Sequence, residues 1–163
     1  MAALLLLLFG LQALIFSGNS QENNYDRLPE TFRNGVDLAL EKLHSHARIQ
    51  HHFLFFKSVL QSDMEPGFDV KYIYHHFYLK ATRCPRGTTN STSCRFRNDR
   101  PLMDCIACYK TFREAVEPEP KPYIHCVHRT TLTPETRKTR EKHCYELGYR
   151  SGSTILLAST GNK

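Results

Sequence analysis

The first periodic pattern of apolar residues predicts an amphipathic helix. Five apolar residues recur at three- and four-residue spacing: Phe32, Val36, Ala39, Leu40 and Leu43. This spacing places them on one face of a helix, which then needs a partner surface to cover it. Pro29 stands where helices often begin. We therefore predict a helix from about Glu30 to His44.

Four later stretches are rich in residues that favour β-strands. They cover roughly residues 48–60, 68–83, 105–115 and 122–132. Pro66-Gly67 indicates a turn between the first two, and the apolar parity changes near His75-His76, which predicts a β-bulge. A helix followed by strands without βαβ alternation predicts an α+β fold. We expect one N-terminal helix packed across a curved antiparallel sheet of about four strands.

The first 20 residues are typical of a signal peptide. They contain no Lys, Arg, Asp or Glu, and the apolar run at 2–16 is too short to span a bilayer comfortably. Small residues precede the expected cleavage between Ser20 and Gln21, and a membrane anchor is the alternative. We then expect a mobile leader at 21–29, one disulfide-bonded domain at 30–144 and a flexible, processed tail at 145–163. The protein would be secreted, with no membrane span.

Six cysteines follow the expected signal peptide, and an even number in a short secreted chain predicts a disulfide framework. Six cysteines allow fifteen pairings. Cys105 and Cys108 suggest zinc or redox chemistry by spacing, but no second pair or βαβ unit accompanies them. We expect no metal and no cofactor.

Strand geometry narrows the pairings. Cys105 and Cys108 have opposite parity in one strand, so their side chains point to opposite faces and do not pair with each other. Cys126 can lie opposite Cys105 in the neighbouring strand, which leaves Cys144 for Cys108. The expected bridges are Cys84–Cys94, Cys105–Cys126 and Cys108–Cys144.

The cysteine spacing behind the segment Gly-Val-Asp-Leu-Ala-Leu-Glu-Lys-Leu-His resembles the chemerin family of retinoic-acid-receptor responder proteins. The resemblance covers residues 31–144 and implies a cystatin-like fold with the same three disulfides. It also implies a proprotein that extracellular serine proteases activate by trimming its tail, and we expect a monomer. The trimmed form would bind a G-protein-coupled chemerin receptor and direct chemotaxis, inflammation and adipocyte differentiation.

The tail departs from the family, whose agonist activity lies in an aromatic-rich segment. It contains Tyr145 and Tyr149 but no aromatic residue after Arg150, so the agonist residues do not transfer by position. Arg150 is the only basic residue between Cys144 and Lys163. We predict cleavage between Arg150 and Ser151 by trypsin-like proteases.

A formal net charge of +6 favours acidic partners, and in a secreted protein heparan sulfate suits this role better than nucleic acid. Either the basic residues share one face or they lie on two separate solvated loops. They fall in two groups: Arg83, Arg86, Arg95, Arg97 and Arg100, then Arg129, Arg137, Lys138, Arg140 and Lys142. Asn90-Ser91-Thr92 is an N-glycosylation sequon in an expected surface loop.

Several functions are disfavoured by missing motifs. The chain has no Gly-x-Ser-x-Gly, no His-Glu-x-x-His and no phosphate-binding glycine loop, so we expect no enzyme activity. A cystatin-like host-defence or glycosaminoglycan-binding protein without receptor agonism is the alternative function. Inhibition of cysteine proteases is less favoured, because the chain lacks Trp and a Gln-x-Val-x-Gly turn. Residues 145–163 carry too little positive charge for a lytic peptide.

Overall fold

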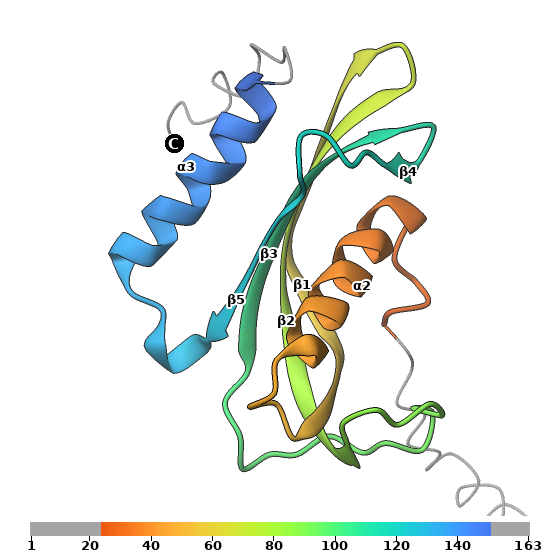
Figure 1. Cartoon of the computed structure of the whole chain (residues 1–163), viewed down its shortest axis with the longest axis vertical. Helices are drawn as coiled ribbons and strands as arrows, with labels where there is room; N and C mark the ends of the chain where they lie inside the picture. The colour runs from red at the N-terminus through yellow and green to blue at the C-terminus, as the bar shows by residue number, and fades with distance from the viewer. Residues whose placement is uncertain (1–23, 151–163) are drawn as a thin grey trace, which may run out of the picture.

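The computed structural model describes residues 24–150, without the side chains of Tyr149 and Arg150. A helix on each side of an antiparallel sheet forms this part of the chain (Figure 1). The sheet has five strands in the order β1-β2-β3-β4, with β5 also paired to β3. The predicted α+β class, with one helix across the sheet and three disulfides, is confirmed. The elements are α2 (Glu30–Ser45), β1 (His51–Gly67), β2 (Val70–Pro85), β3 (Met103–Phe112), β4 (Ala115–Val116), β5 (Tyr123–His128), η2 (Arg129–Thr131) and α3 (Pro134–Arg150).

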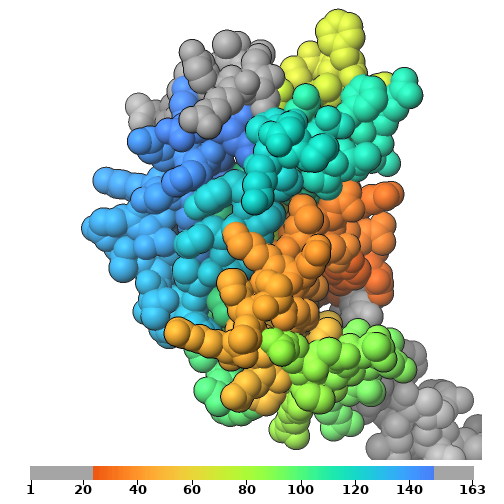
Figure 2. All heavy atoms as spheres, in the orientation of Figure 1, coloured from red at the N-terminus to blue at the C-terminus, as the bar shows by residue number. Residues whose placement is uncertain are grey.

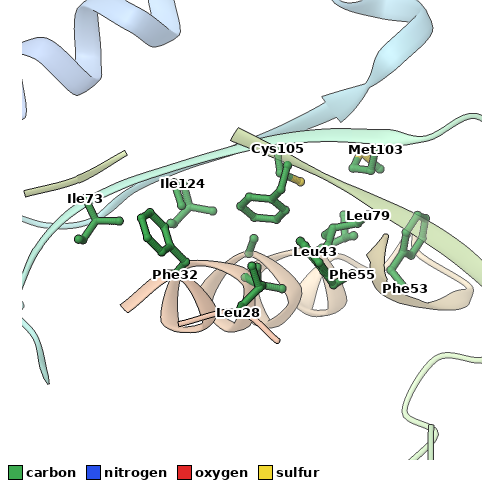
Figure 3. Packing of buried hydrophobic residues seen from close by; sticks show 14 of the residues in the cluster. Leu28, Phe32, Leu43, Phe53, Phe55, Ile73, Leu79, Met103, Cys105 and Ile124 are labelled. Carbon is green, nitrogen blue, oxygen red and sulfur yellow. The ribbon is translucent and has the colours of Figure 1, made fainter. Parts of the chain in front are cut away.

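The main core lies between α2 and one face of the sheet (Figure 3). Val36 and Ala39 of α2 and Phe77 of β2 are fully buried in it. Gly35 is needed for this packing, because a Cβ there would lie 2.9 Å from a ring atom of Tyr109. The Tyr109 hydroxyl in turn donates a hydrogen bond to the Thr31 carbonyl. The glycine that weakens the isolated helix therefore allows the helix and sheet to approach closely.

The β-bulge expected at His75-His76 lies in the partner strand instead. β2 pairs with β3 without a break from Val70 to Leu79. Opposite residues 76–79 of β2, two register shifts place the extra residue in β1, between residues 55 and 60. The sequence pattern was misleading because His75, a polar residue, occupies an inward position and is fully buried.

The first hairpin turn lies slightly later than predicted. β1 continues through Pro66 to Gly67, and Gly67 pairs with Val70 around a two-residue loop, Phe68-Asp69. Pro66 is tolerated because β1 is an edge strand, where a missing N–H need not break a ladder bond. Both loop residues have positive φ, 57° and 58°, as two-residue hairpins with a type I′ turn require.

Replacing the Phe68 side chain is expected to stabilise this hairpin. A bulky residue at positive φ is strained, and Phe68 is 95% exposed, so its ring gains little from packing. We expect Phe68→Asn to raise the free energy of unfolding by about 1 kcal/mol, measured by urea unfolding. Phe68→Ala, which removes the ring without favouring positive φ, is the matched control and should gain less. A loss of stability in both variants would show that the ring makes stabilising contacts.

Helix α3 was not predicted, and the domain boundary expected after Cys144 falls inside it. Its start carries a cap: the Thr133 hydroxyl accepts a hydrogen bond from the Thr136 N–H at 3.1 Å, and Pro134 occupies the first turn. The inward side chains include Arg140 and Cys144, so the helix lacks an obvious apolar stripe. Within residues 24–150, no helix is long and apolar enough to cross a membrane.

The described part of the leader packs against α2. Leu28 is buried in the main core, and the Tyr25 hydroxyl donates a hydrogen bond to the Asp37 carboxylate at 2.6 Å. The mobile leader expected at 21–29 is therefore held to the domain from at least Tyr25 onward. The tail beyond Arg150 and the expected signal peptide lie outside the described residues.

Candidate functional site

A disulfide and a buried ion pair hold α3 against the outer face of the sheet, meaning the face opposite α2 (Figure 1). A disulfide joins Cys108 of β3 to Cys144 of α3, with 5.5 Å between their Cα atoms. Ile106 is buried beside it, and Tyr74 and Tyr123 pack against this second, smaller cluster. The covalent bond fixes the last third of α3 to the centre of the sheet.

One turn before the disulfide, Arg140 makes a buried ion pair with Asp104 of β3. Nη1 of Arg140 donates to Oδ1 of Asp104 at 2.5 Å, and Nη2 donates to the Asp104 carbonyl at 3.0 Å. Nε of Arg140 donates to Nδ1 of His125 at 2.8 Å. The second oxygen of Asp104 lies 3.0 Å from Nε2 of His76. Arg140 and Asp104 are only 3% and 2% exposed, so solvent screens this pair little.

The electrostatics of the group agree with these contacts. Burial would raise the pKa of the Asp104 carboxyl, but hydrogen bonds from His76 and Arg140 outweigh burial and lower it. Burial and then the charge of Arg140 lower the pKa of His125. A neutral His125 accepts the Arg140 N–H as the geometry requires. The arrangement therefore suits a fixed support for α3, since the guanidinium and the carboxylate are both engaged in holding the helix.

The structure contains three disulfides, and Cys105 and Cys108 lie on opposite faces of β3. Cys105 belongs to the core beneath α2, whereas Cys108 lies beneath α3. The side chains of His75 and His76 also point to opposite faces of the sheet, toward Phe32 and Asp104 respectively. Among the described residues, no three His, Cys, Asp or Glu side chains lie close enough together to hold a metal ion. The bridges are Cys84–Cys94, Cys105–Cys126 and Cys108–Cys144.

The processing residues named from the sequence are placed only in part. Asn90 is exposed in the loop that the Cys84–Cys94 bridge closes, and its Oδ1 accepts a hydrogen bond from the Thr92 hydroxyl at 2.6 Å. Arg150 is the last residue of α3 that the structure describes. Ser20, Gln21 and Ser151 lie outside the described residues.

The two groups of basic residues lie on different elements. The first group lies at the end of β2 and in the segment that follows it, at one end of the molecule. Most of the second group lies on α3, which forms one flank (Figure 2). Arg140 is buried and Arg97 is engaged, since its guanidinium bonds Asp99 at 2.5 Å and His51 at 2.6 Å. These two residues are therefore unsuited to bind an external anion.

The partners of Arg140 were missed from the sequence. Asp104 stands 36 residues before it in an otherwise apolar strand, and no spacing rule connects such a pair. One available signal was the position of Arg140 four residues before Cys144, which places both on the same helix face once a helix is assumed.

Together, the helix, the antiparallel sheet and the three disulfides define a cystatin-like α+β protein. No protein-family model matches the chain. Retinoic acid receptor responder protein 2 of Homo sapiens is 25% identical over 118 residues, which cover 72% of this chain and 70% of the relative. The protein of the same name from Pongo abelii matches to the same extent. These relatives confirm the resemblance to the chemerin family.

Proposed function

We propose that this protein is a secreted, chemerin-like signalling proprotein. Proteolysis of its tail would produce a ligand for a G-protein-coupled chemerin receptor in chemotaxis, inflammation and adipocyte differentiation. The observation that carries the proposal is the similarity to retinoic acid receptor responder protein 2 over most of the chain. The three disulfides favour an oxidising extracellular setting. The protein would act as a ligand and not as an enzyme.

The attachment of α3 supports regulation by tail cleavage. The disulfide at Cys144 and the ion pair at Arg140 hold the helix, so removal of residues beyond it need not disturb the scaffold. Lys138 and Lys142 lie within the helix, where the backbone cannot enter a protease site in extended form without unwinding. Arg150 lies beyond Cys144, so cleavage after it would leave the disulfide-bonded part of the helix intact.

The remaining processing steps are part of the same proposal. The signal peptide would be removed between Ser20 and Gln21, and Asn90 would carry a glycan. The exposure of Asn90 in its disulfide-closed loop is compatible with modification. The protein would circulate as a monomer.

A protease-inhibiting function is less well supported by the hairpin. The first turn presents Phe68-Asp69 in a tight two-residue loop, and the chain contains no Gln-x-Val-x-Gly segment and no Trp. A host-defence protein without receptor agonism stays the alternative, because no aromatic residue follows Arg150.

Tail trimming is expected to switch receptor activity. Cells that bear a chemerin receptor should respond by calcium flux or migration to a form ending at Arg150 or at Leu157, and weakly to the form 21–163. Protein made in secreting cells supplies the starting material. Its intact mass, before and after removal of N-glycans, reports the Gln21 start and the Asn90 glycan. Limited trypsin digestion should then release residues 151–163 first.

The matched control for this experiment is Arg150→Gln. This variant should resist release of the tail under the same digestion and stay weakly active. If every form is silent on cells that respond to authentic chemerin, the proposed receptor function is wrong and the scaffold serves another purpose. If trypsin cuts before residue 144 sooner than at Arg150, the regulatory role given to cleavage at Arg150 is wrong.

A further inference from the structure

Three cations gather on the outer face of the sheet, and only one of them, Arg129, belongs to the two basic groups named from the sequence. Lys57 of β1 and Arg129 of η2 both lie over the ring of Tyr78, at 5.9 Å for Nζ and 5.2 Å for Cζ. Lys80, two residues further along β2 on the same face, lies 5.0 Å from the ring centre of Phe56. We call Lys57, Lys80 and Arg129 the outer-face cations. They come from three separate elements, and the fold brings them together.

None of the outer-face cations has a carboxylate within ion-pair distance among residues 24–150. Asp104, on the same face, is already committed to Arg140 and His76. Lys80 donates a hydrogen bond only to a neutral group, the Asn98 side-chain oxygen, at 2.8 Å. The positive charge of this surface is therefore not neutralised within the described structure.

Aromatic rings hold these cations in place. Phe56 and Phe96 pack edge to face, with ring centres 5.7 Å apart, and Lys80 lies near both. Arg129 is further positioned by its backbone N–H, which donates to the Leu102 carbonyl at 2.9 Å. Cations held over rings keep their donors available to an external anion, and they lose less side-chain freedom when the anion binds.

We propose that the outer-face cations form a binding site for a sulfated polysaccharide of the heparan sulfate class. A chain with repeated sulfates can contact all three cations at once, and the release of its counterions favours binding. The nearby rings of Tyr78 and Phe56 offer apolar surface to the sugar backbone. This site goes beyond the proposed receptor function and does not depend on it.

The location differs from the sequence-based expectation. Of the ten basic residues in the two arginine-rich groups, only Arg129 belongs to the proposed site, and Lys57 and Lys80 are new to it. Two other members of the second group already have acidic partners within the protein: Arg140 pairs with Asp104, and Lys142 lies 3.7 Å from Glu146. Three exposed arginines of the first group, Arg83, Arg95 and Arg100, offer a matched comparison of equal charge.

The test is binding of the folded protein 21–163 to a heparin dodecasaccharide at several salt concentrations. In the triple variant Lys57→Gln/Lys80→Gln/Arg129→Gln we expect affinity at physiological salt to fall by about tenfold to a hundredfold. The slope of log K against log salt should fall by about two to three. The control variant Arg83→Gln/Arg95→Gln/Arg100→Gln removes the same charge and should lose less than about threefold. Circular dichroism and thermal unfolding check that both variants fold.

Each other outcome would overturn the proposal. Equal losses in the two triple variants would mean that net charge alone drives binding, and a larger loss in the control would place the site on the loop before β3. Hyaluronan of equal length, which lacks sulfate, should bind far more weakly. Equal affinity for hyaluronan, for duplex DNA or for phosphatidylserine vesicles would show that the surface does not select a sulfated polysaccharide. Failure of the receptor assay would leave these results unaffected.

Discussion

Arg140→Ala is expected to lower the free energy of unfolding by about 3–5 kcal/mol, the usual cost of removing one member of a buried ion pair. The substitution leaves the Asp104 carboxylate buried with only His76 as a side-chain partner, and it leaves Nδ1 of His125 without its donor. The cost comes mainly from the charge that stays buried. Urea unfolding of the disulfide-intact protein, followed by circular dichroism, measures the loss.

Two further variants separate the buried charge from the contacts of the helix. Asp104→Leu/Arg140→Met removes both charges and should recover most of the stability that Arg140→Ala loses. Lys142→Ala removes an exposed cation of the same helix and should cost less than about 0.5 kcal/mol beyond helix propensity. A loss below about 1 kcal/mol in Arg140→Ala would contradict the support role of this pair. Hydrogen exchange should show the amides of α3 opening more readily than those of α2 in the destabilised variant.

The parts of the fold with a regular periodicity of apolar and polar residues were predictable. The stripe from Phe32 to Leu43 is buried against the sheet as α2. The opposite parity of Cys105 and Cys108 correctly placed them on opposite faces of β3, because side chains alternate between the two faces along a regular strand. These inferences depend on one element at a time and need no knowledge of distant partners.

The parts that failed involve polar residues in buried positions. Arg140 occupies an inward position of α3, so the helix carries no continuous apolar stripe, and the partner of Arg140, Asp104, is far away in sequence. His75 fills a core position on β2 and shifted the apparent parity of that strand. In both places a tertiary partner satisfies the polar group, and single-sequence patterns do not contain that partner.

The outer-face cations show the same limitation for function. Counting basic residues along the chain selected segments that are rich in arginine, but residues that are close in sequence need not lie close together on the folded surface. Lys57, Lys80 and Arg129 are far apart in the sequence, and strand pairing together with the turn after β5 brings them to neighbouring rings.

The buried His75 is expected to make the fold sensitive to mild acid. Its ring lies among Phe32, Phe55 and Phe77, and burial lowers its pKa to about 4 from an ordinary value of 6.5. Nδ1–H donates to the Phe32 carbonyl at 3.2 Å, so the neutral ring accepts the Ser58 hydroxyl at Nε2, 2.8 Å away. A proton on Nε2 would remove this acceptor and place a charge in the core.

The sign of the effect follows from the lowered pKa. The unfolded chain takes up a proton near pH 6.5, whereas the folded protein takes it up only near pH 4, so acid favours unfolding between these values. We expect the contribution of His75 to fall by about 1.4 kcal/mol per pH unit and by about 3 kcal/mol across the window. Above pH 7 it should be constant. The pKa of Asp104 is lowered from its ordinary value of 3.8, so protonation of Asp104 reduces stability only in more acidic solution than this window.

Burial also lowers the pKa of His44, His52 and His125, so substitutions at His75 are needed to separate its effect from theirs. His75→Gln can keep both hydrogen bonds without titrating, and His75→Phe replaces them with apolar packing. In urea unfolding from pH 7.5 to 4.5, both variants should show a flatter pH profile than the natural protein, whatever their stability at neutral pH. Parallel profiles for all three proteins would show that His75 is protonated as readily in the fold as in the unfolded chain. Because the ring packs against α2 at Phe32, the acid-induced loss should appear first as weakened packing of α2 on the sheet.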